Sequence, residues 1–276
     1  MKFQPAIKWS GSKRSQSEEI VKRIPKGDYT TYYEPFCGGC SVLFQLLHSD
    51  VNFKRYVCSD KNKGLINLWN EIKNNPEEVI KQYEIMWNEL NIDDDKERKK
   101  NYFYSVRERY NKEGSPYDFM FIMRTTTNGM PRYNNKGEFN NSFHVTRNGV
   151  IPKSLAKTIR EWSEVLNKYK VEFIHGEYND IQPNEEDFIY LDPPYANTKG
   201  MYYGTIDYDK LWDWMRELPC KYMLSFDGKT SSRDETYEVP KDLYSTHEYL
   251  YSGNSSFNRI IGKSSSEYVE ESLYIK

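Results

Sequence analysis

A pair of glycines between an aromatic strand and a helix constrains the fold of this chain more than any other feature. Tyr32 and Tyr33 predict a short strand, Gly38-Gly39 a tight turn, and the apolar spacing of residues 41–47 a helix. Strand, glycine turn and helix form the first half of a nucleotide-binding unit, because glycine lets a ligand approach the backbone closely. We therefore expect an α/β fold with a nucleotide site at this turn.

The next predicted strand, residues 55–60, ends at Asp60, 21 residues beyond Gly39. An acid about 20 residues after the glycine turn is where a Rossmann-type site places the acceptor for a ribose hydroxyl. The glycines do not form G-x-G-x-x-G, and no G-K-[ST] completes the turn to bind a triphosphate. The pocket therefore suits an adenosine-containing ligand without a pyrophosphate, and S-adenosylmethionine fits this description.

A second feature is Asp192-Pro193-Pro194-Tyr195, which follows the apolar residues 188–191, a predicted buried strand. Two prolines fix the backbone there, so a carboxylate, carbonyl oxygens and an aromatic ring are held in one rigid pocket. Such a pocket can bind a planar amino group, because Asp192 and the Pro193 carbonyl accept its two N–H bonds while the Tyr195 ring stacks on it. A plain turn is the alternative, since proline pairs are common in loops.

Four blocks of the sequence together resemble the N6-adenine DNA methyltransferases of the Dam type. Residues 8–13 (K-W-S-G-S-K) resemble their N-terminal block, and residues 34–39 (E-P-F-C-G-G) resemble their methyl-donor loop. Residues 192–195 match their catalytic motif, and residues 128–143 resemble their DNA-recognition hairpin. The order and spacing of the blocks extend the resemblance over almost the whole chain.

The resemblance implies a Rossmann-like S-adenosylmethionine-dependent methyltransferase sheet with an inserted helical target-recognition domain that bears a β-hairpin. Residues 1–62 and 161–276 would form the catalytic domain, and residues 63–160 the DNA target-recognition domain. The apolar spacing of that insertion is helical. We expect the sheet to resume at residues 171–175, to include residues 188–191 and 222–226, to end near 272–275, and to carry a loop over 250–267.

The implied activity is transfer of a methyl group from S-adenosylmethionine to adenine N6 in double-stranded DNA, at GATC or a related site. The adenine would be flipped out of the duplex and would stack on Tyr195, so the ring of this residue should matter more than its hydroxyl. An N4-cytosine DNA methyltransferase and an RNA amine methylase are the alternatives within this chemistry. A non-catalytic DNA-binding module is the alternative outside it.

The resemblance also implies the residues of each site. The catalytic residues would be Asp192, Pro193 and Tyr195. The residues that bind the methyl donor would be Trp9, Lys13, Glu34, Phe36, Gly38, Gly39, Asp60, Glu177, Tyr178 and Asp192. The residues that bind DNA would be Arg124, Asn128, Met130, Arg132, Tyr133, Asn134, Lys136, Asn140 and Ser142. Simple packing is the alternative for Trp9, and a turn cap is the alternative for Asp60.

The chain departs from the family pattern at several of these positions. Cys40 stands where another small residue is usual, and Glu177-Tyr178 replaces a usual Asp-Phe pair. In the hairpin, Thr127 takes the place of an aromatic residue and Ser142 that of a proline. The hairpin departures bear on which DNA sequence is recognised.

Composition agrees with an intracellular enzyme, and we expect a cytoplasmic monomer without metal or membrane attachment. Four cysteines suggest reduced thiols, and packing is favoured over a metal or redox role for Cys37-x-x-Cys40. No segment reaches the roughly 20 apolar residues of a membrane span. The net charge is −2, whereas DNA-binding domains are often basic. The basic residues of 124–147 favour a DNA surface, while those of 96–109 fit a solvated helix equally well.

Overall fold

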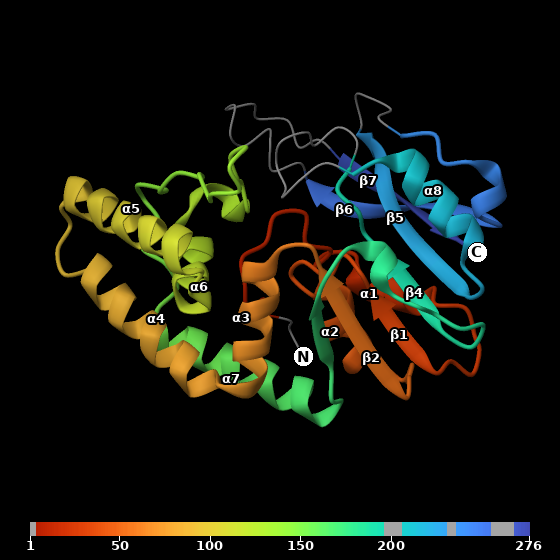
Figure 1. The fold of residues 1–276 in the computed structure, drawn as a ribbon, viewed down its shortest axis with the longest axis horizontal. Coiled ribbons are helices and arrows are strands. Elements are labelled where there is room, and N and C mark those ends of the chain that lie inside the picture. The colour runs from red at the N-terminus through yellow and green to blue at the C-terminus, as the bar shows by residue number, and fades with distance from the viewer. Residues whose placement is uncertain (1–3, 196–205, 231–235, 255–267) are drawn as a thin grey trace. The chain divides into compact units, whose positions relative to one another are not determined.

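The sheet of the computed structural model runs in the order β3-β2-β1-β4-β5-β7-β6 (Figure 1). The structure describes residues 4–195, 206–230, 236–254 and 268–276. The strands are β1 Thr31–Glu34, β2 Arg55–Asp60, β3 Glu172–His175, β4 Phe188–Leu191, β5 Lys221–Thr230, β6 Thr246–Asn254 and β7 Tyr268–Ile275. The helices are α1 Ser17–Lys22, α2 Ser41–Leu47, α3 Lys63–Asn74, α4 Pro76–Leu90, α5 Lys96–Glu113, α6 Pro116–Thr125, α7 Pro152–Lys168 and α8 Tyr208–Glu217. Short 3-10 helices lie at η1 Thr127–Gly129, η2 Tyr178–Asp180 and η3 Lys241–Leu243.

Strand direction confirms the expected α/β fold. β1 is parallel to β2 and to β4, and β4 is parallel to β5, while β7 is antiparallel to both β5 and β6. The order of strands reverses at β1: β2 and β3 are added on one side of it and β4 and β5 on the other, so β1 and β4 are neighbours although they are far apart in sequence. Such a switch point, at the carboxyl ends of parallel strands, is where open α/β sheets bind ligands.

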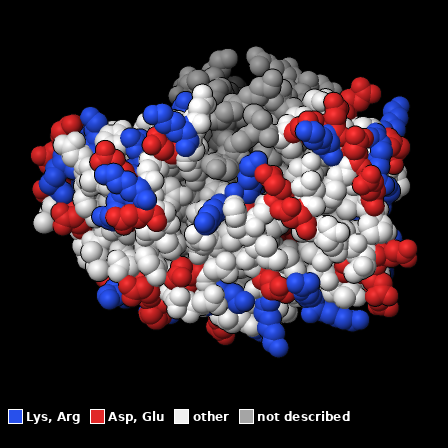
Figure 2. Space-filling view, viewed as in Figure 1, with Lys and Arg blue, Asp and Glu red and all other residues white. Residues whose placement is uncertain are grey.

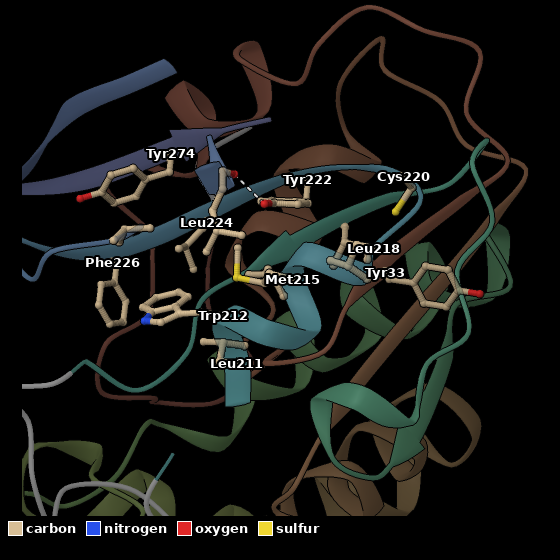
Figure 3. Packing of buried hydrophobic residues seen from close by; sticks show 14 of the residues in the cluster. Tyr33, Leu211, Trp212, Met215, Leu218, Cys220, Tyr222, Leu224, Phe226 and Tyr274 are labelled. Carbon is tan, nitrogen blue, oxygen red and sulfur yellow. Dashed lines mark hydrogen bonds between the residues drawn. The ribbon is translucent and has the colours of Figure 1, made fainter. Parts of the chain in front are cut away.

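The central strands are apolar because both of their faces are buried. On one face, Tyr33, Ile189 and Leu191 pack with α8, and Figure 3 shows Leu211, Trp212 and Met215 of that helix against Leu224 and Phe226 of β5. The Tyr222 hydroxyl in this cluster donates a hydrogen bond of 2.6 Å to the Leu243 carbonyl. On the other face, Tyr32 stacks on Phe188, with ring centroids 6.4 Å apart.

The described chain divides into two compact units. Unit 1 comprises residues 4–12 and 59–176, and unit 2 comprises residues 13–58, 177–195 and the described residues from 206 onward. Most of the sheet, with α1, α2 and α8, belongs to unit 2, and α3 to α7 belong to unit 1. The glycine turn and the Asp-Pro-Pro-Tyr segment therefore lie in unit 2, and the hairpin lies in unit 1.

The helices of unit 1 follow the predicted apolar spacing. α3 buries Leu65, Leu68, Trp69 and Ile72 on one face, and its first turn is capped by the Asn62 side chain. Within this unit α4 packs against α7 and α6, and α3 packs against α6 and α7 (Figure 1). Trp69 stacks on Phe173 of β3 at 5.5 Å and contacts Trp162 of α7 at 4.7 Å. These aromatic residues are part of the buried core of the unit.

Two local expectations differ from the structure. Residues 250–254 of the loop predicted over 250–267 belong to β6, which continues to Asn254 and pairs there with Tyr268 of β7. Serine and glycine remain in a strand here because an antiparallel partner satisfies the backbone; residues 255–267 lie outside the described residues. The hairpin has two isolated antiparallel bridges, Thr126–Phe143 and Tyr133–Phe139, instead of continuous strands.

Candidate functional site

The turn between β1 and α2 has the tight backbone that its glycines predict. Gly38 has φ of 44° and Cys40 has φ of 53°, so both lie in the left-handed region. The Cys40 amide donates to the Cys37 carbonyl at 2.7 Å, and Cys40 is the N-cap of α2. Left-handed backbone costs a non-glycine residue roughly 1–2 kcal/mol. This cost gives a physical reason for the small residue, often glycine, that the family resemblance places at position 40.

The cysteines around this turn are placed for packing. Cys37, Cys40, Cys58 and Cys220 are all described and buried, and none of them forms a disulfide. Burial raises the pKa of the Cys40 and Cys58 thiols, so both stay protonated at neutral pH. No group of three or more His, Cys, Asp or Glu side chains that could hold a metal ion occurs among the described residues.

A charged cluster lies where β4 ends. Asp192 follows directly after Leu191, and its Oδ1 lies 2.9 Å from Nζ of Lys13. The same Nζ lies 3.1 Å from Oε2 of Glu271, in β7. The Lys13 side chain is 5% exposed and the two carboxylates are 17% and 19% exposed. One buried ammonium is therefore shared by two largely buried carboxylates, and we call Lys13, Asp192, Tyr195 and Glu271 the strand-end cluster.

Burial and charge shift the pKa values in this cluster in opposite directions. Burial raises the pKa of Asp192 to about 6, although Lys13 acts to lower it. Burial alone would lower the pKa of Lys13, but Asp192 and Glu271 outweigh this effect and raise it. At neutral pH the ammonium is charged and Asp192 is an ionised hydrogen-bond acceptor.

Tyr195 has contacts on its ring and on its hydroxyl. Lys13 Nζ lies over the ring, 4.6 Å from its centroid, and Phe226 contacts the ring in a T-shaped arrangement at 5.7 Å. The hydroxyl donates to Oε2 of Glu271 at 2.8 Å. Sequence reasoning missed Glu271, because an acid in a C-terminal strand carries no motif that links it to residue 195.

Glu34 and the aromatic residues near the turn complete the candidate residues of unit 2. Glu34 is buried at the end of β1 and accepts a hydrogen bond of 2.7 Å from the Tyr32 hydroxyl. Phe36 stacks on Tyr178 at 5.5 Å, and Tyr178 contacts Trp214 edge-on at 5.1 Å. Glu177 is exposed, and its amide is bound by Asp180 in a capping box.

The sequence that forms this turn and this strand end matches a known protein family. The model of the D12 class N6 adenine-specific DNA methyltransferases matches residues 9–254. The chain belongs to this family.

Curated relatives agree with the assignment to the D12 class. The chain is 32% identical to the type II methyltransferase M.MjaIII of Methanocaldococcus jannaschii, over 71% of this chain and 70% of that protein. It is 28% identical to the type II methyltransferase M1.LlaDCHI of Lactococcus lactis subsp. cremoris, over 70% of this chain and 66% of that protein. It is 30% identical to the DNA adenine methylase of Escherichia coli strain K12, over 69% of this chain and 64% of that protein. Among solved structures, the rRNA methyltransferase aviRa from Streptomyces viridochromogenes aligns over 94% of this chain and 81% of that chain, at 12% identity and a TM-score of 0.38. The family assignment depends on the sequence matches.

In this D12-class chain, the predicted ribose acceptor lies at the end of β2. Asp60 Oδ1 accepts a hydrogen bond of 2.9 Å from the Asn62 amide. The Asn62 side chain in turn caps α3 and donates to the Tyr133 hydroxyl at 2.9 Å. The hydrogen bond from the Asn62 amide is the contact that a turn-capping role of Asp60 requires. The same bond also orients the Asp60 carboxylate.

Asp60→Ala should weaken S-adenosylmethionine binding more than DNA binding. A carboxylate that accepts from ribose hydroxyls is worth about 1.5–3 kcal/mol, or roughly tenfold or more in affinity. Calorimetric titration with the donor measures the change, and Asp60→Asn is the matched control because it keeps an acceptor for the Asn62 amide. Unchanged donor affinity in Asp60→Ala would assign the residue to the turn alone.

Glu34→Gln should change how stability depends on pH. Burial raises the pKa of Glu34 from 4.5 to about 8, so the folded protein holds a proton that the unfolded chain releases. The stability of the wild type should therefore fall as pH rises from about 4.5 towards 8, because the unfolded chain then binds fewer protons than the folded protein. The glutamine side chain cannot ionise and can still accept from Tyr32, so the variant should gain at least about 1 kcal/mol relative to wild type by the upper end of that range. Thermal unfolding at a series of pH values measures this, and parallel curves for both proteins would contradict it.

The N-terminal block of the D12 pattern contacts the hairpin within unit 1. The Ser10 amide donates to the Gly129 carbonyl at 3.0 Å, and Trp9 beside it is partly buried. A Cβ at Gly129 would lie 2.8 Å from the Lys8 carbonyl oxygen, and Gly129 has φ of 65°. Glycine is therefore required at 129 by both close approach and backbone conformation.

The hairpin divides the predicted DNA-binding residues into two groups. Arg132, Lys136 and Ser142 are exposed, and Asn128 and Met130 are partly exposed. Asn134 accepts from the amides of residues 136 and 138 and so builds the turn, and Tyr133 is bound by Asn62. Asn140 Oδ1 is buried without a hydrogen bond to the described residues. Asn141, which the sequence did not single out, holds the hairpin by donating to the carbonyls of Thr127 and Met130.

Arg124 is placed differently from the expectation of a DNA contact. Its guanidinium is buried and donates to the carbonyls of Pro5 and Ala6, so it fastens the N-terminal segment to α6. Burial lowers the pKa of Arg124 to about 10, which leaves it charged at neutral pH. The correction follows from its contacts, because a guanidinium buried against carbonyl oxygens is not presented to a phosphate.

Four of the basic residues of 96–109 form ion pairs within unit 1. Arg98 bonds to Asp93, Lys99 to Asp94, Lys100 to Glu97, and Arg109 to Asp118 at 2.5 Å. In Figure 2, acidic and basic side chains are intermixed on the left of the view, where Figure 1 places α5. These pairings support the helix-surface interpretation of α5.

None of the described helices is long and apolar enough to span a membrane.

Proposed function

We propose that this chain transfers the methyl group of S-adenosylmethionine to N6 of an adenine flipped out of double-stranded DNA. The observation that supports this most is the position of Asp192, a largely buried carboxylate at the end of β4 that shares Lys13 with Glu271 beside the Tyr195 ring. Adenine N6 is a poor nucleophile, because its lone pair is delocalised into the ring. A rigid acceptor is therefore the group that such a reaction needs.

The residues of unit 2 fit the proposed donor. Its sulfonium is a cation, and the strand-end cluster offers two carboxylates against one ammonium. The left-handed turn at Gly38 and Cys40 allows close approach of a ligand to the backbone, and Phe36 stacked on Tyr178 offers an aromatic surface. We assign donor binding in unit 2 to Lys13, Glu34, Phe36, Gly38, Gly39, Glu177, Tyr178 and Asp192, and in unit 1 to Trp9 and Asp60. When bound, the donor supplies an electrophilic methyl group on sulfur.

The residues of this chain would act by positioning and electrostatics. The Asp192 carboxylate and the Pro193 carbonyl accept the two N–H bonds of the amine, which favours a pyramidal nitrogen with its lone pair directed at the methyl group. Tyr195 stacks on the base and holds its plane. Asp192 must be ionised to accept, and with its pKa at about 6 it is ionised at neutral pH. Loss of the N6 proton accompanies or follows methyl transfer, and no covalent enzyme intermediate is required.

The hairpin is the proposed DNA-recognition element, with GATC or a related sequence as the target. Arg132 is exposed there and can form a bidentate contact with guanine O6 and N7. Thr127 has no aromatic ring to insert between stacked bases, and Ser142 lacks the apolar contact that a proline would make with a thymine methyl group. These two differences favour a target related to GATC over GATC itself. We assign residues 1–62 and 161–276 to catalysis and 63–160 to target recognition, in a cytoplasmic monomer.

One assay tests the function. The protein is incubated with methyl-labelled S-adenosylmethionine and duplex DNA, and the DNA is digested to nucleosides and separated by chromatography. The expected product is N6-methyladenosine in its deoxy form. Label in N4-methylcytosine would identify a cytosine methyltransferase, and label in RNA but not in DNA would identify an RNA methylase. Absence of label from both DNA and RNA would reject the proposed function.

A further inference from the structure

Glu271 links the parts of the strand-end cluster. Its Oε2 accepts the hydrogen bond of the Tyr195 hydroxyl at 2.8 Å and lies 3.1 Å from Nζ of Lys13. Lys13 in turn contacts Asp192 at 2.9 Å and lies over the Tyr195 ring. One carboxylate oxygen therefore contacts both the residue proposed to hold the base and the residue that pairs with the proposed amine acceptor.

Glu271 lies opposite a β-bulge in β5. The register of β5 and β7 shifts between Phe226 and Lys229, so Asp227 and Gly228 stand opposite the single residue Glu271. A Cβ at Gly228 would lie 1.9 Å from the Glu270 carbonyl oxygen and 2.6 Å from the Glu271 Cα, so only glycine lets β7 approach this closely. The bulge increases the local twist of the strand pair, and the close approach of the two backbones fixes the position of Glu271 along β7.

Glu270, the residue before Glu271, lies at the surface and not in the strand-end cluster. Glu270 pairs with Lys229 at 3.3 Å, and its side chain is 40% exposed. Successive side chains of a strand point to opposite faces, so adjacent glutamates serve the surface and the cluster. This pair provides a matched control for any change at Glu271.

We propose that Glu271 is a positioning residue for methyl transfer, which fixes the Tyr195 ring and gives Lys13 a second acceptor. The inference depends on the proposed function. The Lys13 ammonium over the ring and the hydrogen bond from the Tyr195 hydroxyl together fix the orientation of the ring on which a base would stack. When an amine binds Asp192 it competes with Lys13, and Lys13 keeps Glu271 as its partner.

Glu271 also influences the ionisation of Asp192. The titratable groups that act on Asp192 or are affected by it are Lys13, Tyr195, Glu271, Glu34 and Tyr190. Burial is the largest cause of the raised pKa of Asp192; Lys13 lowers this pKa, and the charge of Glu271 raises it. Removal of that charge should therefore lower the pKa of Asp192, and the acid side of the activity profile should move to lower pH.

The test is Glu271→Gln in the full chain, assayed with S-adenosylmethionine and duplex DNA across the acidic to neutral range. We expect kcat to fall about tenfold, because the Tyr195 hydroxyl and Lys13 then contact a neutral amide and no longer a carboxylate, with the KM for DNA little changed. The acid limb should shift to lower pH. Glu271→Asp keeps the charge but shortens the reach, so it should lower kcat and leave the acid limb at its wild-type position. Glu270→Gln should match wild type in both measurements.

A double-mutant cycle with Tyr195→Phe tests the shared contact. Tyr195→Phe should lower kcat several-fold in the wild-type background and less in Glu271→Gln, because the hydrogen bond that it removes there goes to a neutral amide oxygen and is already weakened. Additive losses, or a Glu271→Gln protein with wild-type kcat and acid limb, would overturn the positioning role. A wild-type protein that does not methylate adenine would reject the proposed function instead. If Glu271→Gln does not fold, Glu271→Asp and Tyr195→Phe must still lower kcat for the inference to stand.

Discussion

Asp192→Ala should abolish methyl transfer while the protein remains folded. The variant loses the ionised acceptor for the amine, and removal of one preorganised polar group at a reacting centre costs about 100-fold or more in rate. The fold should persist because Asp192 follows the last residue of β4, and Lys13 keeps its contact with Glu271. Single-turnover methylation of duplex DNA measures the loss, and circular dichroism verifies the fold.

Asp192→Asn separates the charge of this residue from its shape. Asparagine keeps one acceptor oxygen at the same reach but carries no charge to pair with Lys13. It should retain more activity than Asp192→Ala and much less than wild type. A folded Asp192→Ala protein with most of the wild-type turnover would refute the catalytic role and would leave the Asp-Pro-Pro-Tyr segment as a plain turn.

Arg132→Ala should relax sequence discrimination at one guanine of the target. A bidentate arginine–guanine contact contributes about 1–3 kcal/mol of discrimination. Arg132 is exposed in the hairpin, and its carbonyl accepts from the Asn140 amide, so the backbone should keep its shape when the side chain is removed. Methylation mapping of DNA from cells that express the variant reports the target sequence directly.

Lys136→Ala is the matched control in the same hairpin. Lys136 is exposed in the turn that Asn134 builds, and a lysine there suits a phosphate contact without base information. Its removal should weaken all sequences alike and leave the motif unchanged. An Arg132→Ala enzyme with the wild-type motif and fidelity would place base recognition on other residues.

The elements that the sequence predicted best are those defined by local patterns. β1, the glycine turn and α2 follow from an aromatic pair, two glycines and a helical apolar face within residues 31–47. β4 follows from four apolar residues stopped by Pro193. In both cases neighbouring residues determine the structure, so no knowledge of distant partners was needed.

Residues whose role depends on a distant partner could not be predicted. Tyr195 and Glu271 are 76 positions apart, and only the register of β7 brings them together. Arg124 was assigned to DNA because a basic residue in a basic segment has the same sequence signal whether it is buried or exposed. Its partners, the carbonyls of Pro5 and Ala6, lie more than 100 positions away and carry no side-chain pattern.

The division of the chain into units limits where this protein can be shortened. The described chain crosses between the units at 12/13, 58/59 and 176/177, so neither unit is one continuous segment. A fragment that ends at residue 176 would contain β1 but not β4, its hydrogen-bonded neighbour. The unpaired edge of β1 and its buried tyrosines would then be open to other chains. We expect such a fragment to aggregate, so a split version of this enzyme would need both pieces produced together.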